Sequence, residues 1–188
     1  MTQKAVFLDR DGVLVEEIFY PHTGEREAPL GPNDVCLLPG AAQGLRDLRA
    51  AGFSLVVVSN QGAAAKGKVS IGSLWLAHLR FLDLCAAEGI AFDGCHYSFS
   101  HPNGTVPHLS GSSLERKPSP YFLHLAAAQL DIDLTASWMV GDRETDVQCG
   151  QAAGARAIRL CNPVQPSAAE VVASDLPEAA FLIIAAAR

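Results

Sequence analysis

The chain has 188 residues, of which 49% are hydrophobic and 18% are charged, and this composition excludes an intrinsically disordered protein. The formal net charge of -6 at pH 7 argues against a general nucleic-acid or membrane surface, because such partners attract clustered Lys and Arg. The length suits one domain, so we expect residues 1–188 to fold as a single unit.

Short, nearly continuous apolar runs predict four strands buried on both faces, at residues 4–8, 54–58, 137–140 and 155–160. Helical patterns lie between them, at residues 41–51, 73–88, 118–130 and 144–153. The tail at 171–187 suggests one more short strand, a turn at 175–177 and an apolar closing helix. Because strands alternate with helices, we predict an α/β fold with a doubly wound, mainly parallel, Rossmann-like sheet and no large cap domain.

Two segments show no regular pattern, residues 20–39 and residues 98–116, and both are rich in Pro and Gly. Both are longer than the usual connection between elements. Long irregular segments beside a catalytic edge often bind ligands, so we expect these two to select the substrate.

The five cysteines are odd in number and include no Cys-x-x-Cys pair, so neither a disulfide framework nor a thiolate zinc site is suggested. The first apolar run is too short for a signal peptide, and no other apolar stretch has spanning length. We therefore expect reduced thiols, no membrane partner and a cytoplasmic location.

Two aspartates, Asp9 and Asp11, follow the first predicted strand, and Gly12 gives the backbone freedom to turn there. With both carboxylates facing one site, one can attack phosphorus to form an aspartyl-phosphate while the other moves protons. The simpler alternative is a polar turn after a buried strand, which Asp and Gly commonly form.

A second pair, Asp142 and Asp146, lies one helical turn apart near a predicted helix start, so its carboxylates share a face. Helix capping is the simpler alternative, and the role of Asp146 stays open. Clustered carboxylates and a phosphate would repel one another, so this chemistry needs a cation. Mg²⁺ prefers such oxygen ligands, and Asp9 and Asp142 are the best candidates to bind it.

Lys117 offers positive charge to a transferring phosphoryl group, and Ser59 offers a hydroxyl to another of its oxygens. Alone, a Lys is usually solvated and a Ser after a strand is usually a turn residue. Their position along the chain favours a catalytic role. Three of the four polar segments follow predicted strands, and an open α/β sheet binds its ligand at the ends of its strands.

In this order, the segments resemble the four motifs of the haloacid dehalogenase (HAD) superfamily of aspartate-nucleophile phosphatases, at residues 9–12, Ser59, Lys117 and residues 141–142. The resemblance implies one HAD-like hydrolase domain. It also implies that Asp9 is the nucleophile and Asp11 the acid and base. Mg²⁺ would then be held by Asp9, the backbone carbonyl of Asp11, and Asp142.

The chain is more narrowly similar to the D,D-heptose 1,7-bisphosphate phosphatase branch, over residues 7–12, 59–62, 66–68, 116–118 and 141–143. That similarity implies removal of the 7-phosphate from D-glycero-D-manno-heptose 1,7-bisphosphate. It implies that Arg116 and Arg143 recognise the substrate, and our further candidates for substrate binding are Arg10, Asn60, Gln61 and Glu17.

Members of that branch usually carry a zinc loop, at positions where this chain has Ser98, Ser100, Ser113 and Glu115. Hydroxyl groups do not replace thiolates on zinc, so zinc is not expected. Three histidines lie nearby, His96, His101 and His108. Their irregular spacing favours ordinary loop residues over another metal site.

Several alternatives stay open. The segment at 20–39 is either a solvated loop or, with residues 98–115, the wall of a sugar-phosphate pocket in which Glu17 or Arg26 contacts hydroxyls. A histidinol-phosphate phosphatase is the nearest rival enzyme, and an uncapped crevice also suits larger phosphates. A non-catalytic phosphosugar-binding protein would not require both a nucleophile and an acid/base, and the sequence makes no prediction of oligomeric state.

Overall fold

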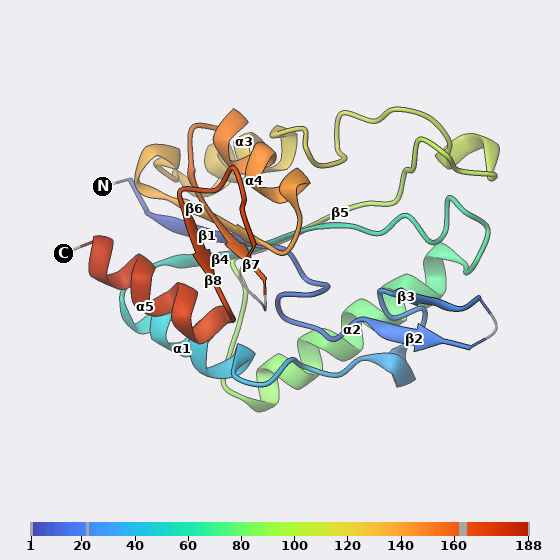
Figure 1. Cartoon of the computed structure of the whole chain (residues 1–188), viewed down its shortest axis with the longest axis horizontal. Helices are drawn as coiled ribbons and strands as arrows, with labels where there is room; N and C mark the ends of the chain where they lie inside the picture. The colour runs from blue at the N-terminus through green and yellow to red at the C-terminus, as the bar shows by residue number, and fades with distance from the viewer. Residues whose placement is uncertain (1, 22, 162–164, 188) are drawn as a thin grey trace.

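The computed structural model describes residues 2–21, 23–161 and 165–187, and a parallel sheet of six strands runs through its centre (Figure 1). Its order is β5-β4-β1-β6-β7-β8, all pairs being parallel. The strands are β1 (Ala5–Leu8), β4 (Ser54–Asn60), β5 (Gly94–Ser98), β6 (Trp138–Gly141), β7 (Arg156–Leu160) and β8 (Val171–Ala173). The predicted doubly wound α/β fold is therefore confirmed.

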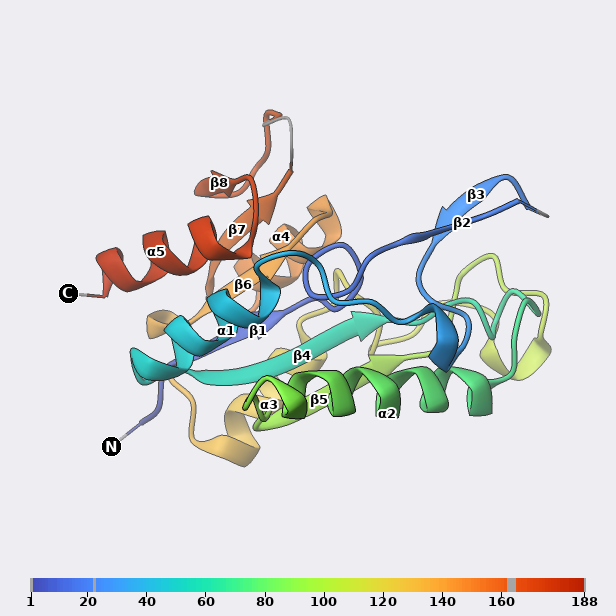
Figure 2. The same cartoon turned by 90° about the horizontal axis from the view of Figure 1, so that it is seen from below.

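Helices cover both faces of this sheet. One face carries α1 (Ala41–Ala50), α2 (Ile71–Ala87) and α5 (Leu176–Ala186), and the other carries α3 (Tyr121–Leu130) and α4 (Glu144–Ala152) (Figures 1 and 2). Single 3-10 turns lie at Pro32–Asp34, Pro107–Leu109 and Leu134–Ala136. Among the described residues, none of these helices combines the length and the apolar character needed to cross a membrane.

The apolar runs form strands because both of their faces are buried. In β1, Val6 and Leu8 belong to the core beneath α1, α2 and α5, whereas Ala5 and Phe7 belong to the core beneath α3 and α4. Successive side chains of a strand point to opposite faces. A central strand between two helical layers therefore needs apolar residues at every position.

Two strand-containing regions differ from the sequence expectation. A short antiparallel hairpin of β2 (Ile18–Tyr20) and β3 (Glu25–Glu27) overlaps the start of the segment 20–39, which was expected to be irregular. Strand β5 was not predicted, because Gly94, Cys95 and His96 are only half-buried at the sheet edge and form no apolar run.

Helix α3 begins at Tyr121 rather than at the predicted Pro118. The reason lies in the second proline, Pro120, which takes the position directly before the helix. A residue that precedes proline is disfavoured in the helical region, so Ser119 does not join the helix.

The carboxyl ends of β1, β4 and β6 meet at one edge of the sheet. A backbone hydrogen bond from Asp9 N to Val140 O, 2.9 Å long, continues the pairing of β1 with β6 beyond the end of β1. The hairpin and the loop that follows β5 extend past this edge (Figure 2). This topology brings together segments that are far apart in the sequence, at the point where the strand order reverses.

Candidate functional site

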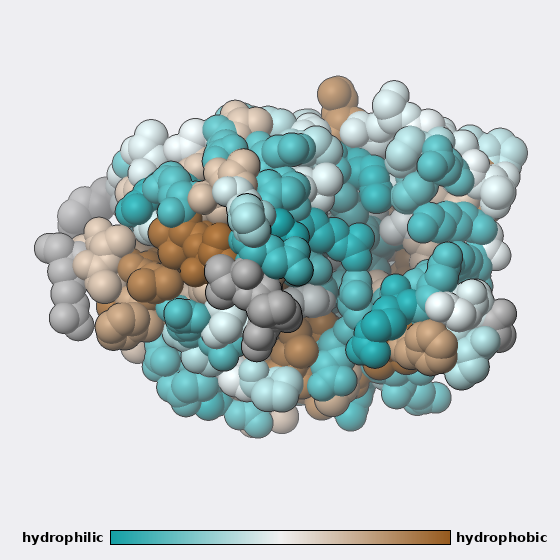
Figure 3. Space-filling view, viewed as in Figure 1, coloured by the Kyte–Doolittle hydropathy of each residue, from teal (hydrophilic) through white to brown (hydrophobic). Residues whose placement is uncertain are grey.

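A cavity of about 960 Å³ opens at this edge of the sheet. The four residues predicted to be catalytic all line it, and their exposed fractions lie between 2% and 7%: Asp9, Asp11, Ser59 and Lys117. The surface in Figure 3 is mostly hydrophilic over its middle and right-hand parts, whereas hydrophobic surface gathers over α5. Polar groups buried in such a site interact more strongly than they would in water.

The Lys117 ammonium is the buried positive charge of the site. Its Nζ lies 3.1 Å from Asp9 Oδ1 and 2.6 Å from Asp146 Oδ1, and it donates to Val58 O at 2.7 Å. Burial alone would lower the pKa of Lys117, but Asp146 and Asp9 outweigh burial and raise it above its usual value. Lys117 therefore stays charged and bridges two carboxylates.

Asn60 holds the backbone of Lys117. The Asn60 amide donates from Nδ2 to Lys117 O at 3.1 Å and accepts at Oδ1 from Lys117 N at 3.0 Å. These two bonds employ both polar ends of the amide, although Asn60 also lines the cavity. Asn60 thus has a structural contact with Lys117, and its role in substrate binding stays a prediction.

Three carboxylates form a cluster beside Lys117. Side-chain oxygens of Asp9, Asp142 and Asp146 lie within 4.8 Å of one another. Asp142 Oδ1 is buried and has no hydrogen-bond partner among the described residues. Burial, followed by the negative charges of Asp9 and Asp146, raises the pKa of Asp142 to about 7. An oxygen-rich cluster with an unpartnered buried oxygen fits a divalent cation such as Mg²⁺.

Two glycines allow this cluster to close. Gly12 has a positive φ of 79°, and a Cβ placed there would lie 2.6 Å from Asp142 Oδ2. A Cβ at Gly141 would overlap the side chain of Asp146. Both positions therefore exclude larger side chains, and the first also needs the left-handed backbone that glycine adopts readily.

Asp146 has a structural role that its spacing did not reveal. Its Oδ2 accepts from the backbone N of Arg143 at 3.0 Å at the start of α4, and its Oδ1 faces Lys117. The capping alternative is therefore correct for one oxygen, while the other oxygen holds the buried ammonium.

Arg10 faces away from the cavity, and its role in substrate binding stays a prediction. It is 1% exposed and is not among the described residues that line the cavity. Its guanidinium donates to Asp11 Oδ1 from Nε at 2.9 Å and from Nη2 at 2.8 Å. The side chain points inward because the carboxylate offers compensation for its buried charge.

Gln61 contacts Asp11 from the other side. Its Nε2 donates to Asp11 Oδ2 at 2.5 Å and to Ser59 Oγ at 3.1 Å, and its Oε1 accepts from Arg10 Nη2 at 2.9 Å. Although Gln61 lines the cavity, these bonds employ its whole amide. Its observed contacts thus serve Asp11 and Ser59 rather than a ligand.

The cavity mouth carries two arginines. Arg143 Nη2 lies 2.6 Å from Glu17 Oε1, and the Arg143 side chain is 63% exposed. Arg116 donates from Nη1 to Ser100 O at 2.9 Å, and burial and the charge of Arg143 lower its pKa. Both arginines and Glu17 line the cavity, and an anion between the guanidinium groups would relieve their repulsion.

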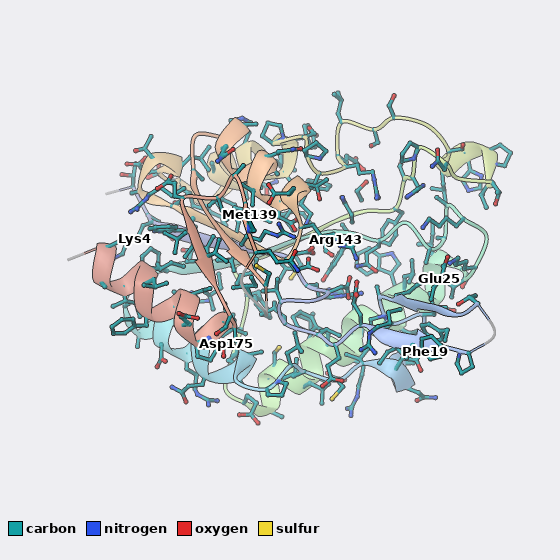
Figure 4. All side chains as sticks on the ribbon, viewed as in Figure 1. Lys4, Phe19, Glu25, Met139, Arg143 and Asp175 are labelled. Atoms are coloured by element: carbon teal, nitrogen blue, oxygen red, sulfur yellow. The ribbon has the colours of Figure 1, made fainter. Side chains whose placement is uncertain are left out.

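The β2–β3 hairpin forms one wall of the cavity. Lys68 pairs with Glu25 Oε2 at 2.8 Å and also with Glu27, which ties the hairpin to the turn after β4. Arg26 donates to the backbone O of Glu17 at 2.7 Å. Figure 4 shows Glu25 on the hairpin and Arg143 near the ends of the central strands, and both line the cavity.

The loop after β5 forms another wall and lines the cavity with His101, while Lys66 lines it from the turn after β4. Neither residue was predicted to belong to the site. The loop packs on the turn after β4 through hydrogen bonds to Ala65 O from Thr105 N (2.7 Å) and Val106 N (3.0 Å). In the sequence, a single basic residue in a loop that lines a cavity looks the same as one on the solvent-exposed surface. The sequence therefore could not identify these residues.

The four positions related to a zinc loop lie around this wall. Ser98 Oγ is buried, Ser100 O accepts from Arg116, and Ser113 Oγ accepts from Glu115 N at 3.2 Å. Within the described part of the chain, the aspartate cluster is the one group of His, Cys, Asp and Glu side chains close enough to hold a metal. That this chain binds no zinc stays a prediction.

Replacing Asp142 should stabilise the protein when no metal is bound. Asp142→Asn removes a charge that burial, Asp9 and Asp146 disfavour, so we expect the free energy of unfolding to rise by about 2 kcal/mol near pH 8. The folded pKa is raised, so the carboxylate destabilises the fold fully above about pH 7 and progressively less as the pH falls.

The measurement is urea unfolding of both proteins in EDTA at about pH 8 and about pH 5. The free energy of unfolding of Asp142→Asn should exceed that of the wild type by more at the higher pH. Added Mg²⁺ should stabilise the wild type and should stabilise Asp142→Asn much less. Equal stabilities of the two proteins at both pH values would contradict the assigned repulsion.

Comparison with known proteins finds phosphatases among the relatives of this chain. Residues 114–162 match the HAD-hydrolase-like family model. The chain is 39% identical over 158 residues to the D-glycero-D-manno-heptose-1,7-bisphosphate 7-phosphatase of Thermosynechococcus vestitus, an alignment that covers 82% of this chain and 76% of that protein. It is 32% identical to the D-glycero-beta-D-manno-heptose-1,7-bisphosphate 7-phosphatase of Escherichia coli, over 93% of this chain and 92% of that protein.

A solved structure has the same fold. The D,D-heptose 1,7-bisphosphate phosphatase of B. bronchiseptica, complexed with magnesium and phosphate, superposes with a TM-score of 0.79 at 22% identity. The superposition covers 98% of this chain and 99% of that one. At this identity, the likeness concerns the fold.

Proposed function

This chain belongs to the family of HAD-like hydrolases that contains the heptose-1,7-bisphosphate 7-phosphatases, and from that premise we propose that it removes the 7-phosphate of D-glycero-D-manno-heptose 1,7-bisphosphate. The observation that carries the proposal is the placing of Asp9 and Asp11 side by side in one cavity with the buried Lys117. A carboxylate nucleophile, a second carboxylate for proton transfer and a fixed cation are what phosphoryl transfer to an aspartate requires.

Asp9 acts as the nucleophile in this proposal. Its carboxylate attacks phosphorus, the bond between phosphorus and the C7 oxygen breaks, and Asp11 donates a proton to that oxygen. Water then attacks the phosphorus of the aspartyl-phosphate and gives its proton to Asp11, the bond from phosphorus to Asp9 breaks, and inorganic phosphate leaves. Each proton transfer contributes about 10²–10⁴-fold to the rate.

The surrounding residues hold the reacting groups. Lys117 and the backbone N of Arg10 both contact Asp9 Oδ1, which fixes the carboxylate. Mg²⁺, held by Asp9, Asp142 and the backbone carbonyl of Asp11, would supply positive charge to the phosphoryl oxygens. Ser59 offers its hydroxyl on the cavity wall to another phosphoryl oxygen.

The wider cavity suits an anionic sugar. Its volume of about 960 Å³ lies in the range of small-molecule sites. Arg116 and Arg143 provide positive charge beyond the reacting centre, while the carboxylates of Glu17, Glu25 and Glu27 can accept hydrogen bonds from sugar hydroxyls. The single-domain organisation and the cytoplasmic location stay predictions from the sequence.

A substrate panel tests the proposal. Phosphate release would be measured with Mg²⁺ from heptose 1,7-bisphosphate, other sugar mono- and bisphosphates, histidinol phosphate and nucleotides. We expect kcat/KM to be highest for the heptose bisphosphate, turnover to stop in EDTA and activity to return with Mg²⁺. A preference for histidinol phosphate would contradict the substrate, and turnover that resists the chelator would contradict the metal-assisted mechanism.

A further inference from the structure

Asp11 is held on both of its carboxylate oxygens by buried donors. Arg10 donates two hydrogen bonds to Oδ1, at 2.9 and 2.8 Å, and Gln61 donates one to Oδ2 at 2.5 Å. Ser59 Oγ lies 3.4 Å from Oδ2 on the same side. With both oxygens engaged, the plane of the carboxylate is fixed relative to the cavity.

The two donor residues also hold each other. Gln61 Oε1 accepts from Arg10 Nη2 at 2.9 Å, so Arg10, Gln61 and Asp11 close a ring of hydrogen bonds. Arg10 is 1% exposed and Gln61 is 2% exposed. Gln61 lines the cavity but is almost fully buried, so both residues are held mainly by each other and by Asp11.

A layer of aromatic side chains supports this ring from β5 and α2. The guanidinium carbon of Arg10 lies 5.8 Å from the ring centroid of Tyr97, a cation–π distance. The Tyr97 hydroxyl is 2.8 Å from His78 Nδ1, and both side chains are buried. The Arg10 side chain thus lies between a carboxylate and an aromatic face, which restricts it to one orientation.

We propose that Arg10 and Gln61 are positioning residues, which orient Asp11 for proton transfer in both halves of the reaction; this rests on the proposed phosphatase activity. Asp11 must come within hydrogen-bond distance of the leaving oxygen and later of the attacking water. A misplacement of about 1 Å can cost about 10²-fold in rate. The ring of hydrogen bonds supplies this alignment without contact with the substrate.

Gln61→Leu is the most direct test, because leucine keeps a similar volume but donates no hydrogen bond. For a substrate with an alkyl alcohol as leaving group, we expect kcat to fall about 10²-fold and KM to change by less than about threefold. The loss should fall on kcat because the altered group assists the chemical steps and leaves the binding contacts in place.

An aryl phosphate gives a second readout that a general loss of structure would not produce. Transfer from p-nitrophenyl phosphate to Asp9 needs little proton donation, since nitrophenolate leaves readily, but hydrolysis of the aspartyl-phosphate still needs Asp11 as base. Gln61→Leu should therefore release a burst of about one nitrophenolate per active site before a slow steady phase.

Arg10 provides a graded comparison. Arg10→Met removes both bonds to Asp11, whereas Arg10→Lys keeps the charge and one donor, so the lysine variant should retain more of kcat. If Arg10→Met does not fold, the comparison of Arg10→Lys and Gln61→Leu with wild type still decides the question. The matched control is Ser137→Ala, which removes the hydrogen bond that Ser137 Oγ accepts from Ala5 N and the one that it donates to Asp133 O. Its kcat should stay unchanged.

Three outcomes would overturn the proposal. The first is a kcat for Gln61→Leu within about twofold of wild type. The second is an equal loss for alkyl and aryl substrates without a burst. The third is an unchanged orientation of the Asp11 carboxylate in crystal structures of wild type and Gln61→Leu. This structural comparison also tests the positioning role when the wild type turns over no phosphate, a result that would contradict the proposed function alone.

Discussion

Asp9→Asn is expected to abolish phosphate release while leaving the fold intact. An amide is a very poor nucleophile for phosphorus, so the aspartyl-phosphate cannot form, and we expect kcat to fall by at least about 10⁴-fold. The fold should survive, because asparagine has the same size and its oxygen can still accept from Lys117 and from Arg10 N. Phosphate release and far-UV circular dichroism measure the two effects.

The matched control is Asp83→Asn on the exposed face of α2, which should leave kcat unchanged. Acid-quenched wild-type enzyme should carry a phosphoryl group on Asp9, and the Asp9→Asn protein should carry none. Substantial turnover by Asp9→Asn, or a phosphorylated residue other than Asp9, would remove Asp9 as the nucleophile.

Lys117→Met should have the largest effect on stability. Lys117 is 3% exposed, and its Nζ lies 3.1 Å from Asp9 Oδ1 and 2.6 Å from Asp146 Oδ1. Its loss leaves two buried carboxylates without a counter-charge, and breaking such a buried pair costs about 3–5 kcal/mol. We expect the free energy of unfolding in urea to fall by this amount without Mg²⁺, and kcat to fall by about 10²–10³-fold.

A second substitution separates lost charge from lost packing. Lys117→Met combined with Asp146→Asn removes the unpaired carboxylate as well and should regain part of the lost stability, as a double-mutant cycle would measure. Lys4→Met, at the opposite end of β1, is the matched control and should cost at most about 1 kcal/mol through its contact with Phe53. A Lys117→Met protein as stable as this control would contradict the assigned ion pairs.

The sequence predicted the central strands well, because burial between two helical layers requires apolar residues at every position. Strand β1 is the clearest case, since all four of its residues are buried. The same reasoning missed β5 and the β2–β3 hairpin. The residues of these strands are largely half-buried or exposed, so they form no apolar run. These strands form through pairing with a neighbouring strand, and a single sequence does not reveal that pairing.

For the site, the sequence predicted which residues follow the strands, but it did not predict the direction of every side chain among them. Asp9 and Asp11 face the cavity because the turn at Gly12 follows directly from the local sequence. Arg10 lies between them yet points into the core, toward a partner 51 positions further along the chain, Gln61. Contacts between residues so far apart in the sequence depend on how the chain packs. The ion pair of Asp146 with Lys117 is another such contact, and the sequence did not predict it.

The loop after β5 is held at both ends by Asn60, the last residue of β4, and by Gln61, which follows it. Gln61 N donates to Ser98 O at 2.7 Å where the loop begins, and the Asn60 amide binds Lys117 where it ends. The interior of the loop can therefore change in length or sequence at a modest entropic cost without displacing Lys117. We therefore expect changes within this segment to alter which substrate the cavity accepts, while Lys117 keeps its position beside Asp9.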